Sequence, residues 1–422
     1  MKNILRSRIL TGVLISIVVL SGVLAAVMKN PAEKSYREYD PAELAGGSAE
    51  TVIPIKNYNF LKIYDGEKGL FLCGKEDNEN EYMLIDEEGN TVRTYTTEGT
   101  VYDICGKYAV TADSSDYAGI LINLEDGSVL EKGIVEDWNN NTGDFLIRKN
   151  EELSVMNQKG KIIYSTSLKT VEQEENDDRL YYPEFADDDY INVFNEDKTA
   201  DLINIRTGET VYHTGENEGV LKKEGDKWVV YQQNEDGTSV YSFLNEDFTE
   251  AFEGKKCLNY KASDGYFAFS ELLEDGMDNK DKVYCPDGSE FNISRYGYQV
   301  RGFADNMVLV GKGTSLVNYV NLEGPDKGKS AYKSSDACER KFYNGMAPAC
   351  KSTINEVYAE TGIPEEEKSG TGLEWGFVDK NLNHVTDFAF DYVSDIENGY
   401  AVVGKYRHYN MHYGVIRLDG GK

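Results

Sequence analysis

The residues that could bind a ligand gather near the C-terminus. Tyr406, His408, Tyr409, His412 and Tyr413 share the segment YRHYNMHYG. The two imidazoles could share a metal ion, or they could line a binding face together with the tyrosine rings. A zinc site normally needs three or four protein ligands, and the sequence offers no third one here. We predict a ligand-binding face at these residues, with ordinary loop histidines as the alternative interpretation.

A second segment has the composition of a weak calcium loop. Asp137, Asn139 and Asn141 alternate in DWNNNTGD before Gly143. Oxygen ligands at alternate positions are typical of EF-hand loops. The glycine comes one place late, however, and no glutamate follows at the spacing of the bidentate ligand. Calcium is therefore the one cofactor that the sequence suggests, and a solvated loop explains the same residues.

No segment carries a catalytic motif. The nucleophile elbow G-x-S-x-G, the P-loop, H-E-x-x-H and the dinucleotide-binding glycine pattern are all missing from the sequence. A glycosidase would need two facing carboxylates, and with 74 acidic residues the sequence cannot nominate a pair. The acids that recur in the turns of the chain, such as Asp86, Asp379 and Asp419, are typical of turns, where they form hydrogen bonds with nearby backbone groups. We predict no catalytic residue.

The six cysteines are Cys73, Cys105, Cys257, Cys285, Cys338 and Cys350. In an exported chain, an even number allows three disulfides. Cys338 and Cys350 flank ERKFYNGMAPA, whose Asn-Gly pair predicts a hairpin turn, so they are the predicted disulfide. The alternative is a set of buried free thiols, which pack as small apolar side chains.

The charge balance excludes one class of partner. The chain has 44 Lys and Arg against 74 Asp and Glu, a formal net charge of −30. Binding nucleic acid requires cations that neutralise phosphates, so we expect no nucleic-acid partner. Cations, neutral glycans and basic proteins remain, and the charge also keeps an exported protein soluble.

The N-terminus carries an export signal. The basic segment MKNILRSR precedes an uncharged run of 20 residues from Ile9 to Met28, about the length of a membrane-spanning helix. The positive flank predicts a cytoplasmic N-terminus with the remaining chain outside. Residues 1–28 are predicted to be an uncleaved signal anchor, or a cleaved signal peptide with Val23 and Ala25 at positions −3 and −1 of the cleavage site. Residues 29–49, with Pro and Gly-Gly, are predicted to be a flexible stalk.

The elements that position these residues form a repeat. A strand, a turn with Asp or Asn and usually a glycine, and a second strand recur nine times, from EYMLIDEEGNTVRTY at 81–95 to YGVIRLDGG at 413–421, mostly about 40 residues apart. No segment shows a sustained helical period. Units of this length with three or four strands are typical of β-propeller blades. We predict an all-β fold over 50–422, a propeller of about eight blades (seven to nine). Its ring is closed by the N-terminal strand ETVIPIKNYNF at 50–60, which completes the last blade.

The segment WGFVDKNLNHVTDFAFDYVSDIENGYAVV resembles the WG β-repeat of bacterial surface and secreted proteins. Trp375, Gly376, Phe377, Val378 and Asp379 match its head, and Tyr392, Gly399, Tyr400, Ala401 and Val402 match the remainder. YGVIRLDG at 413–420 is a partial second head, with Arg417 where the motif has Asp. The resemblance implies a structural, binding-type repeat without shared catalytic residues, and it supplies no active site.

These observations predict an exported, membrane-anchored, non-catalytic β-propeller, an extracellular scaffold that binds a protein or glycan at the bacterial cell surface; the alternative location is secretion. Two other functions stay open. One is a propeller-type glycan lyase or hydrolase with carboxylates in the central channel. The other is an accessory or sensor subunit of a membrane complex, which an uncleaved anchor would favour.

Overall fold

The computed structural model describes residues 38–75, 78–97, 99–112, 119–130, 133–168, 182–273, 276–277, 281–293, 299–304, 307–311, 317–325, 327–328, 330–334, 336–337, 343–352, 373–379, 383–407 and 409–418. The chain divides into two compact units, Met1–Glu38 and Tyr39–Lys422. The predicted membrane segment at 9–28 lies outside the described residues. Within the part that is described, no helix has both the length and the apolar character needed to cross a membrane.

The second unit begins inside the predicted stalk. Helix α2 (Pro41–Leu44) starts at Asp40, whose side chain accepts the Ala42 N–H. An Asp cap followed by proline at the first helical position is a strong helix start. Tyr39 bridges Ile55, and Ala45 is 1% exposed. Residues 39–49 are therefore part of the compact unit and not a flexible stalk, because their apolar side chains pack on it.

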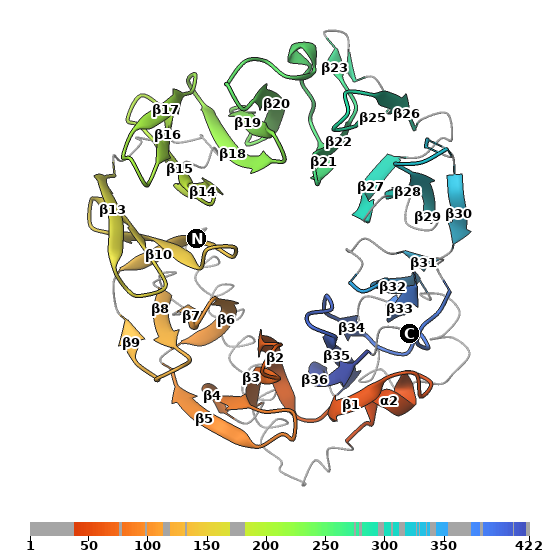
Figure 1. The fold of residues 1–422 in the computed structure, drawn as a ribbon. Coiled ribbons are helices and arrows are strands. Elements are labelled where there is room, and N and C mark those ends of the chain that lie inside the picture. The colour runs from red at the N-terminus through yellow and green to blue at the C-terminus, as the bar shows by residue number, and fades with distance from the viewer. Residues whose placement is uncertain are drawn as a thin grey trace, which may run out of the picture. The chain divides into compact units, whose positions relative to one another are not determined.

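The described residues form nine antiparallel sheets of three or four strands and one separate hairpin. Figure 1 shows the strands of each sheet side by side. The first four sheets are β2 (Tyr58–Asp65), β3 (Leu70–Lys75), β4 (Asn78–Ile85) and β5 (Thr91–Thr96); β6 (Thr100–Cys105), β7 (Tyr108–Ala112), β8 (Gly119–Asn123) and β9 (Val129–Leu130); β10 (Ile134–Asn139), β11 (Asp144–Lys149), β12 (Glu152–Met156) and β13 (Ile162–Ser167); and β14 (Glu184–Asp187), β15 (Tyr190–Phe194), β16 (Ala200–Asn204) and β17 (Thr210–His213).

The next four sheets continue in chain order. They are β18 (Glu218–Glu224), β19 (Lys227–Gln233) and β20 (Ser239–Asn245); β21 (Tyr260–Ser263), β22 (Tyr266–Phe269), β25 (Lys282–Tyr284) and β26 (Glu290–Asn292); β27 (Gln299–Ala304), β28 (Met307–Gly311), β29 (Val317–Asn321) and β30 (Ser330–Ser334); and β31 (Asp336–Ala337), β32 (Met346–Ser352) and β33 (Leu373–Asp379). A 3-10 turn, η1 (Phe252–Gly254), follows β20, and the hairpin β23 (Leu272–Leu273) and β24 (Gly276–Met277) is inserted before β25.

The ninth sheet combines the two ends of this unit. Its strand order is β1 (Glu50–Ile53), β36 (Asn410–Arg417), β35 (Tyr400–Arg407) and β34 (Tyr392–Val393). Glu50 pairs with Arg417 and Thr51 with Ile416, so the predicted pairing with the last repeat is confirmed for residues 50–53. Residues 58–60 of the predicted strand belong instead to β2 in the first sheet. The nine sheets fall within the predicted range of seven to nine repeats, and consecutive four-stranded antiparallel sheets are the architecture of propeller blades.

The turn acids act as predicted. Oδ1 of Asp86 accepts the N–H of Glu88 at 3.1 Å and of Asn90 at 2.8 Å. Oδ1 of Asp379 likewise accepts the N–H of Asn383 at 2.8 Å. The glycine in such turns, Gly89 for example, has a φ of 76°, which other residues adopt only with strain. Asp86 and Asp379 are thus structural caps, and Asp419 lies outside the described residues.

In four sheets, the first strand donates a backbone hydrogen bond to a side chain of the preceding sheet. In β6, β14, β18 and β27, a bulge shifts the register by one residue. A bulge leaves ladder groups without strand partners. In each case the residue just before the bulge donates its N–H to a side-chain oxygen: Val101 to the Tyr82 hydroxyl (3.0 Å), Phe185 to Asp137 (2.7 Å), Val220 to Asn192 (3.0 Å) and Val300 to Asp281 (2.7 Å). These bonds fix the register between successive sheets.

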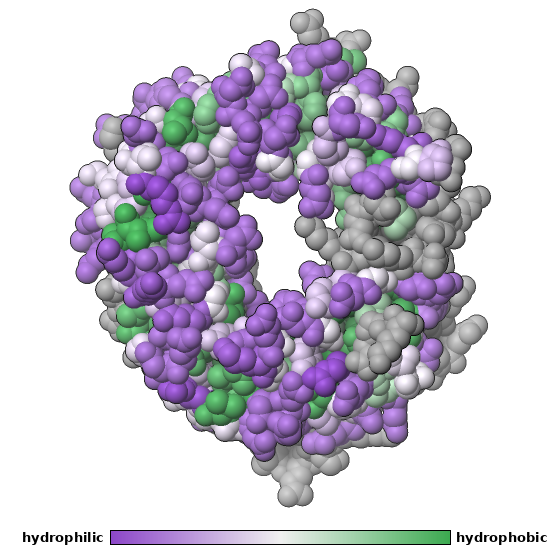
Figure 2. All heavy atoms as spheres, viewed as in Figure 1, coloured by the Kyte–Doolittle hydropathy of each residue, from purple (hydrophilic) through white to green (hydrophobic). Residues whose placement is uncertain are grey.

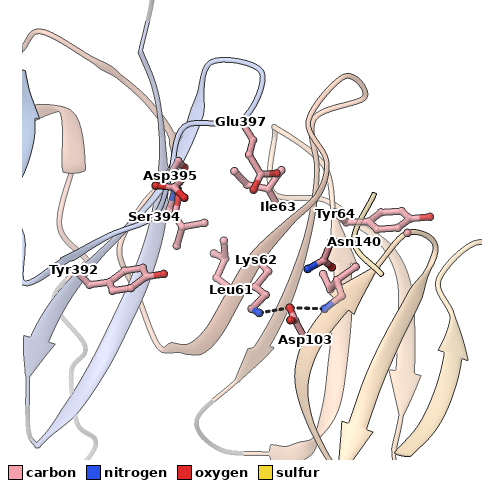
Figure 3. Close-up of a pocket in the computed structure, with 13 residues that line it drawn as sticks. Leu61, Lys62, Ile63, Tyr64, Asp103, Asn140, Tyr392, Ser394, Asp395 and Glu397 are labelled. Carbon is pink, nitrogen blue, oxygen red and sulfur yellow. Dashed lines mark hydrogen bonds and ion pairs between the residues drawn. The ribbon is translucent and has the colours of Figure 1, made fainter. Parts of the chain in front are cut away.

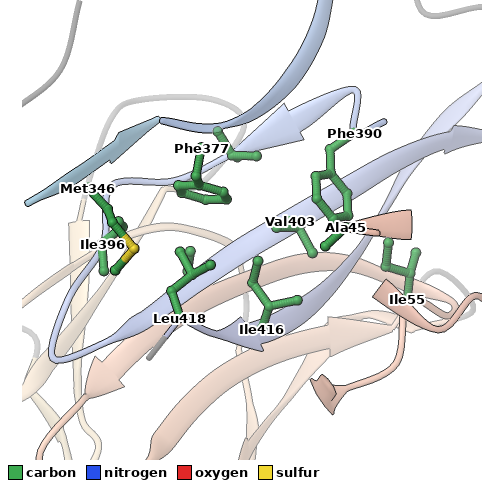
Figure 4. Packing of buried hydrophobic residues seen from close by; sticks show 11 residues of the cluster. Ala45, Ile55, Met346, Phe377, Phe390, Ile396, Val403, Ile416 and Leu418 are labelled. Carbon is green, nitrogen blue, oxygen red and sulfur yellow. The ribbon is translucent and has the colours of Figure 1, made fainter. Parts of the chain in front are cut away.

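Apolar side chains fill the space between neighbouring sheets. One cluster joins β32 and β33 to the ninth sheet through Met346, Phe377 and Phe390, with Ala45 from the segment after α2 (Figure 4). Another joins the ninth sheet to the first, with Val415 packed near Phe71. Polar contacts reinforce that junction: Arg417 Nη2 lies 2.7 Å from Glu87 Oε2, and the Tyr400 hydroxyl donates to Glu87 Oε1. Arg417, at the position where the repeat motif has Asp, therefore holds the two ends together.

The cysteines divide into two groups. Cys73, Cys105, Cys257 and Cys285 are buried free thiols, which supports the alternative interpretation for these four. Burial raises the pKa of Cys73, Cys105 and Cys257 to about 12. Cys338 lies outside the described residues. Its neighbour Ala337 pairs in register with Cys350 across β31 and β32, and the Cys338–Cys350 disulfide stays a prediction.

Candidate functional site

A pocket of about 620 Å³ lies where the ninth, first, second and third sheets approach one another. Strands β2 and β6 form one wall, Tyr392 and the segment after β34 form the other, and Asn140 follows β10 (Figure 3). This volume is in the range of small-molecule sites, about 300–1,000 Å³. The lining residues are Leu61, Lys62, Ile63, Tyr64, Asp103, Ile104, Gly106, Asn140, Tyr392, Ser394, Asp395, Glu397 and Val402.

An ion pair organises the first wall. Lys62 Nζ on β2 lies 2.5 Å from Asp103 Oδ1 on β6, and both side chains are partly exposed. The same Asp103 oxygen accepts the Ile104 N–H at 2.8 Å. The bulge in β6 between Val101 and Asp103 turns this carboxylate toward the neighbouring sheet. The ion pair offers a ligand both a charged donor and a charged acceptor.

Two carboxyl groups stand on the opposite wall. Although Glu397 as a residue is exposed, its carboxyl group lies among the pocket walls. Loss of water around that group raises its pKa, and the charge of Asp395 raises the pKa further, while Lys62 lowers it. Ser394 is fixed beside them, since its Oγ donates to the Asp395 carbonyl and accepts the Val402 N–H. Glu397 thus holds a proton more readily than an ordinary glutamate.

Tyr392 supplies an aromatic surface to the pocket. Its side chain is 37% exposed and points toward Leu61 and Lys62 (Figure 3). The Tyr413 ring packs edge-on behind it, with centroids 5.5 Å apart. Tyr413 was among the residues predicted to bind a ligand, and it reaches the pocket only through this contact.

The other predicted ligand-binding residues are not brought together. His412 is buried in β36 at 4% exposure, opposite Lys405, whereas Tyr409 is 67% exposed in the turn between β35 and β36. The N–H of Tyr406 donates to the buried carboxylate of Asp391. His408 lies outside the described residues. Since alternate residues of a strand point to opposite faces, His412 and Tyr413 cannot share one surface.

The calcium candidates have structural partners. Asp137 accepts the N–H groups of Phe185 and Trp138 through its two oxygens. Oδ1 of Asn139 accepts the N–H groups of Asn141 and Thr142, and Nδ2 of Asn141 donates to Asp188. Among the described residues, no group of three or more His, Cys, Asp or Glu is placed to hold a metal ion. Calcium binding by Asp137, Asn139 and Asn141 stays a prediction.

Sequence reasoning missed the pocket because its residues are far apart in the chain. Lys62, Asp103 and Glu397 belong to three different repeats, and their shared surface exists only after the ninth sheet packs on the first. Tyr392 was identified from the sequence only as part of the WG-type segment. Nothing in the segment indicates that its ring faces a cavity.

The WG containing repeat family matches the chain at residues 375–406. This range contains β34, most of β35 and the pocket residues Tyr392 to Val402. A comparison with curated proteins gave no match.

Solved structures similar to this chain share little sequence with it. The crystal structure of the eukaryotic initiation factor has 9% identity and a TM-score of 0.50, covering 84% of this chain and 90% of that one. BamB from Moraxella catarrhalis has 9% identity and a TM-score of 0.39, covering 83% and 94%. The β-propeller domain of Cps50 (Swd1) from Myceliophteria thermophila has 10% identity and a TM-score of 0.28, covering 70% and 93%. The first likeness concerns the fold alone, and the other two are too weak to carry an argument.

Proposed function

We propose that this chain is a non-catalytic binding module of the β-propeller type that holds a glycan in the pocket between Lys62 and Glu397. The observation that carries the proposal is the combination of one exposed ring, Tyr392, with several hydrogen-bonding side chains around about 620 Å³. A sugar offers an apolar ring face and many hydroxyls, and this pocket supplies a partner for each. A protein loop of the same polarity is the second ligand class.

The surrounding surface supports a polar ligand. The described residues on the face in Figure 2 are mainly hydrophilic, with small separate hydrophobic patches. Protein–protein interfaces usually have a more continuous apolar centre. The formal charge of −30 disfavours an acidic glycan and leaves neutral or amino sugars.

The proposal includes location and ring closure. Residues 9–28 are the anchor or export signal, so the module acts outside the cell, either membrane-bound or secreted. Strand β1 closes a ring of sheets by completing the last one. The support is the β1–β36 pairing and the packing of the ninth sheet on the first.

One observation favours an enzyme as the second candidate. A carboxyl group with a raised pKa beside another carboxylate is the arrangement that glycosidases use for acid catalysis. Glu397 and Asp395 have this relationship. In that case Glu397 is the general acid, and replacing it abolishes turnover.

A glycan array probed with the full chain tests both candidates. We expect retention of a neutral or amino-sugar glycan, loss of retention in Tyr392→Ala, and unchanged retention in Tyr409→Ala, where an exposed tyrosine is removed elsewhere. Each retained glycan is then incubated with the chain and its products are analysed. If the chain releases products from a glycan and Glu397→Gln does not, the protein is a glycosidase and the binding proposal is wrong. Retention that Tyr392→Ala leaves intact, or no retention at all, would contradict the proposed site.

A further inference from the structure

A second, smaller cavity lies at the junction of the fourth and fifth sheets and shares no residue with the first. Its volume is about 180 Å³, and its lining residues are Tyr182, Glu184, Leu221, Tyr231, Gln233, Ser239 and Tyr241. Three of these are tyrosines, one is a glutamate, and none is a lysine or an arginine. The volume is below the range of about 300–1,000 Å³ for drug-sized ligands, so the cavity suits one small headgroup or one side chain.

Two tyrosines form fixed walls of this cavity. Tyr231 on β19 is 8% exposed and packs with Phe194, Ala200 and the partly buried Leu221 and Tyr241. Tyr241 on β20 also contacts Tyr260 on β21, with ring centroids 5.1 Å apart. Tyr182, just before β14, is 62% exposed. The cavity therefore has two rings held by the core and a third that is open to a ligand.

Glu184 carries the one carboxyl group of the lining. Glu184 opens β14, and the next residue, Phe185, donates its N–H to Asp137 at 2.7 Å, which fixes the strand. Burial and, to a smaller extent, the nearby charge of Asp137 raise the pKa of Glu184 to about 8, against the opposing effect of the Tyr231 hydrogen bond. The neighbouring lysine, Lys222, is already paired with Glu224 outside the cavity. No positive charge of the lining opposes Glu184.

We propose that this cavity binds an organic cation, an alkylammonium group seated among the rings of Tyr182, Tyr231 and Tyr241 and facing the Glu184 carboxylate. Aromatic faces attract cations, and cages of several rings recognise quaternary ammonium groups. The net charge of −30 raises the local concentration of cations near the surface. This site does not depend on the proposed glycan pocket, and either can fail without the other.

Binding of a permanent cation is coupled to the proton of Glu184. The groups that face this carboxyl are Asp137 on β10, Tyr231 on β19, Tyr241 on β20 and Tyr260 on β21, all acidic or neutral. A bound cation stabilises the carboxylate and lowers its pKa. Affinity therefore rises with pH and levels off above about 8, the pKa of the empty site. Below that pH it falls roughly tenfold per unit until the pKa of the occupied site is reached.

Calorimetric titration of the full chain tests the proposal. The probes are choline, its neutral isostere 3,3-dimethylbutanol, and a peptide that contains one trimethyllysine. We expect choline to bind at pH 8.5 and more weakly at pH 6.5, and the neutral alcohol not to bind. Tighter binding of the peptide would identify the source of the cation as a protein side chain, and tighter binding of choline would identify a free metabolite or headgroup.

Two variants separate the charge from the rings. Glu184→Gln keeps the shape of the side chain and is expected to weaken choline binding more than about tenfold at pH 8.5 and to remove the pH dependence. Tyr182→Ala removes an exposed ring and weakens binding without unfolding the chain. The matched control is Tyr392→Ala at the other pocket, which leaves choline affinity unchanged. The proposal is overturned by equal affinity for the neutral alcohol, by pH-independent binding in the unmodified chain, or by no binding at millimolar concentrations.

Discussion

The Tyr82 hydroxyl allows a direct test of how successive sheets are held in register. Tyr82 is 4% exposed, and its oxygen accepts the N–H of Val101 at 3.0 Å, next to the bulge in β6. Tyr82→Phe removes this one oxygen and keeps the ring in its edge-on contact with Phe60 at 5.5 Å. The apolar area buried stays the same, and the Val101 N–H loses its acceptor. A buried N–H without an acceptor costs about 1–3 kcal/mol.

Urea unfolding and amide hydrogen exchange measure this effect together. We expect the free energy of unfolding of Tyr82→Phe to fall by about 1–3 kcal/mol, and exchange at Val101 to accelerate about tenfold or more. Tyr409→Phe, at a side chain that is 67% exposed, is the matched control and should change neither quantity. If Tyr82→Phe lowers stability by less than about 0.5 kcal/mol and Val101 exchanges at its original rate, the sheets are held by packing alone.

Three further predictions concern charge and burial. Arg417→Met removes the partly exposed ion pair with Glu87 and should lower the free energy of unfolding by less than about 1 kcal/mol in urea titrations. The Tyr400 hydrogen bond and, to a smaller extent, Arg417 lower the pKa of Glu87, so their stabilising contribution is present above the ordinary glutamate pKa and is lost as pH falls through the lowered value. Arg417→Met should reduce that acid loss in part, because the Tyr400 hydrogen bond remains, and an unchanged loss of stability at acid pH would contradict this. Glu184→Gln should stabilise the fold by a few kcal/mol at pH 9 and have no effect near pH 4. The raised pKa makes folding less favourable as pH rises from the ordinary glutamate pKa to about 8, because the carboxylate then has to form in a buried place. Equal stabilisation at both pH values would contradict this prediction. Cys73, Cys105 and Cys257 should react with iodoacetamide at pH 8 only after denaturation, because burial hides these thiols and raises their pKa. Mass spectrometry of the labelled peptides measures this reaction.

The repeat pattern was sufficient for the strands because each unit encodes its own turn. Asp86 and Asp379 form hydrogen bonds with residues two to four places later, so their role is local and the sequence predicts it. The pairing of β1 with β36 was also predictable, since the last repeat lacks a strand, which residues 50–53 supply. The extent of the stalk could not be predicted from the sequence, because Ala45 and Tyr39 are held by contacts with distant strands.

The site residues show where this kind of reasoning stops. The YRHYNMHYG segment was chosen for its composition, but His412 is buried in β36 and Tyr409 is exposed in the turn between β35 and β36. Asp137 resembled a metal ligand, and the structure uses both its oxygens for backbone N–H groups. A carboxylate has the same sequence signature in a metal loop and at a sheet junction, and only its neighbours distinguish them.

The sequence by itself determined the strands, the turns, the repeat length and the acidic character, because all of these depend on residues close together in the chain. Only the tertiary structure decided which side chains meet across repeats. Lys62 meets Asp103 because the bulge in β6 turns the carboxylate toward β2. Glu184 lies among three tyrosines because the fourth and fifth sheets pack together there. Loss of water at those junctions raises the pKa values of Glu184 and Glu397, and burial is a property that a linear sequence does not specify.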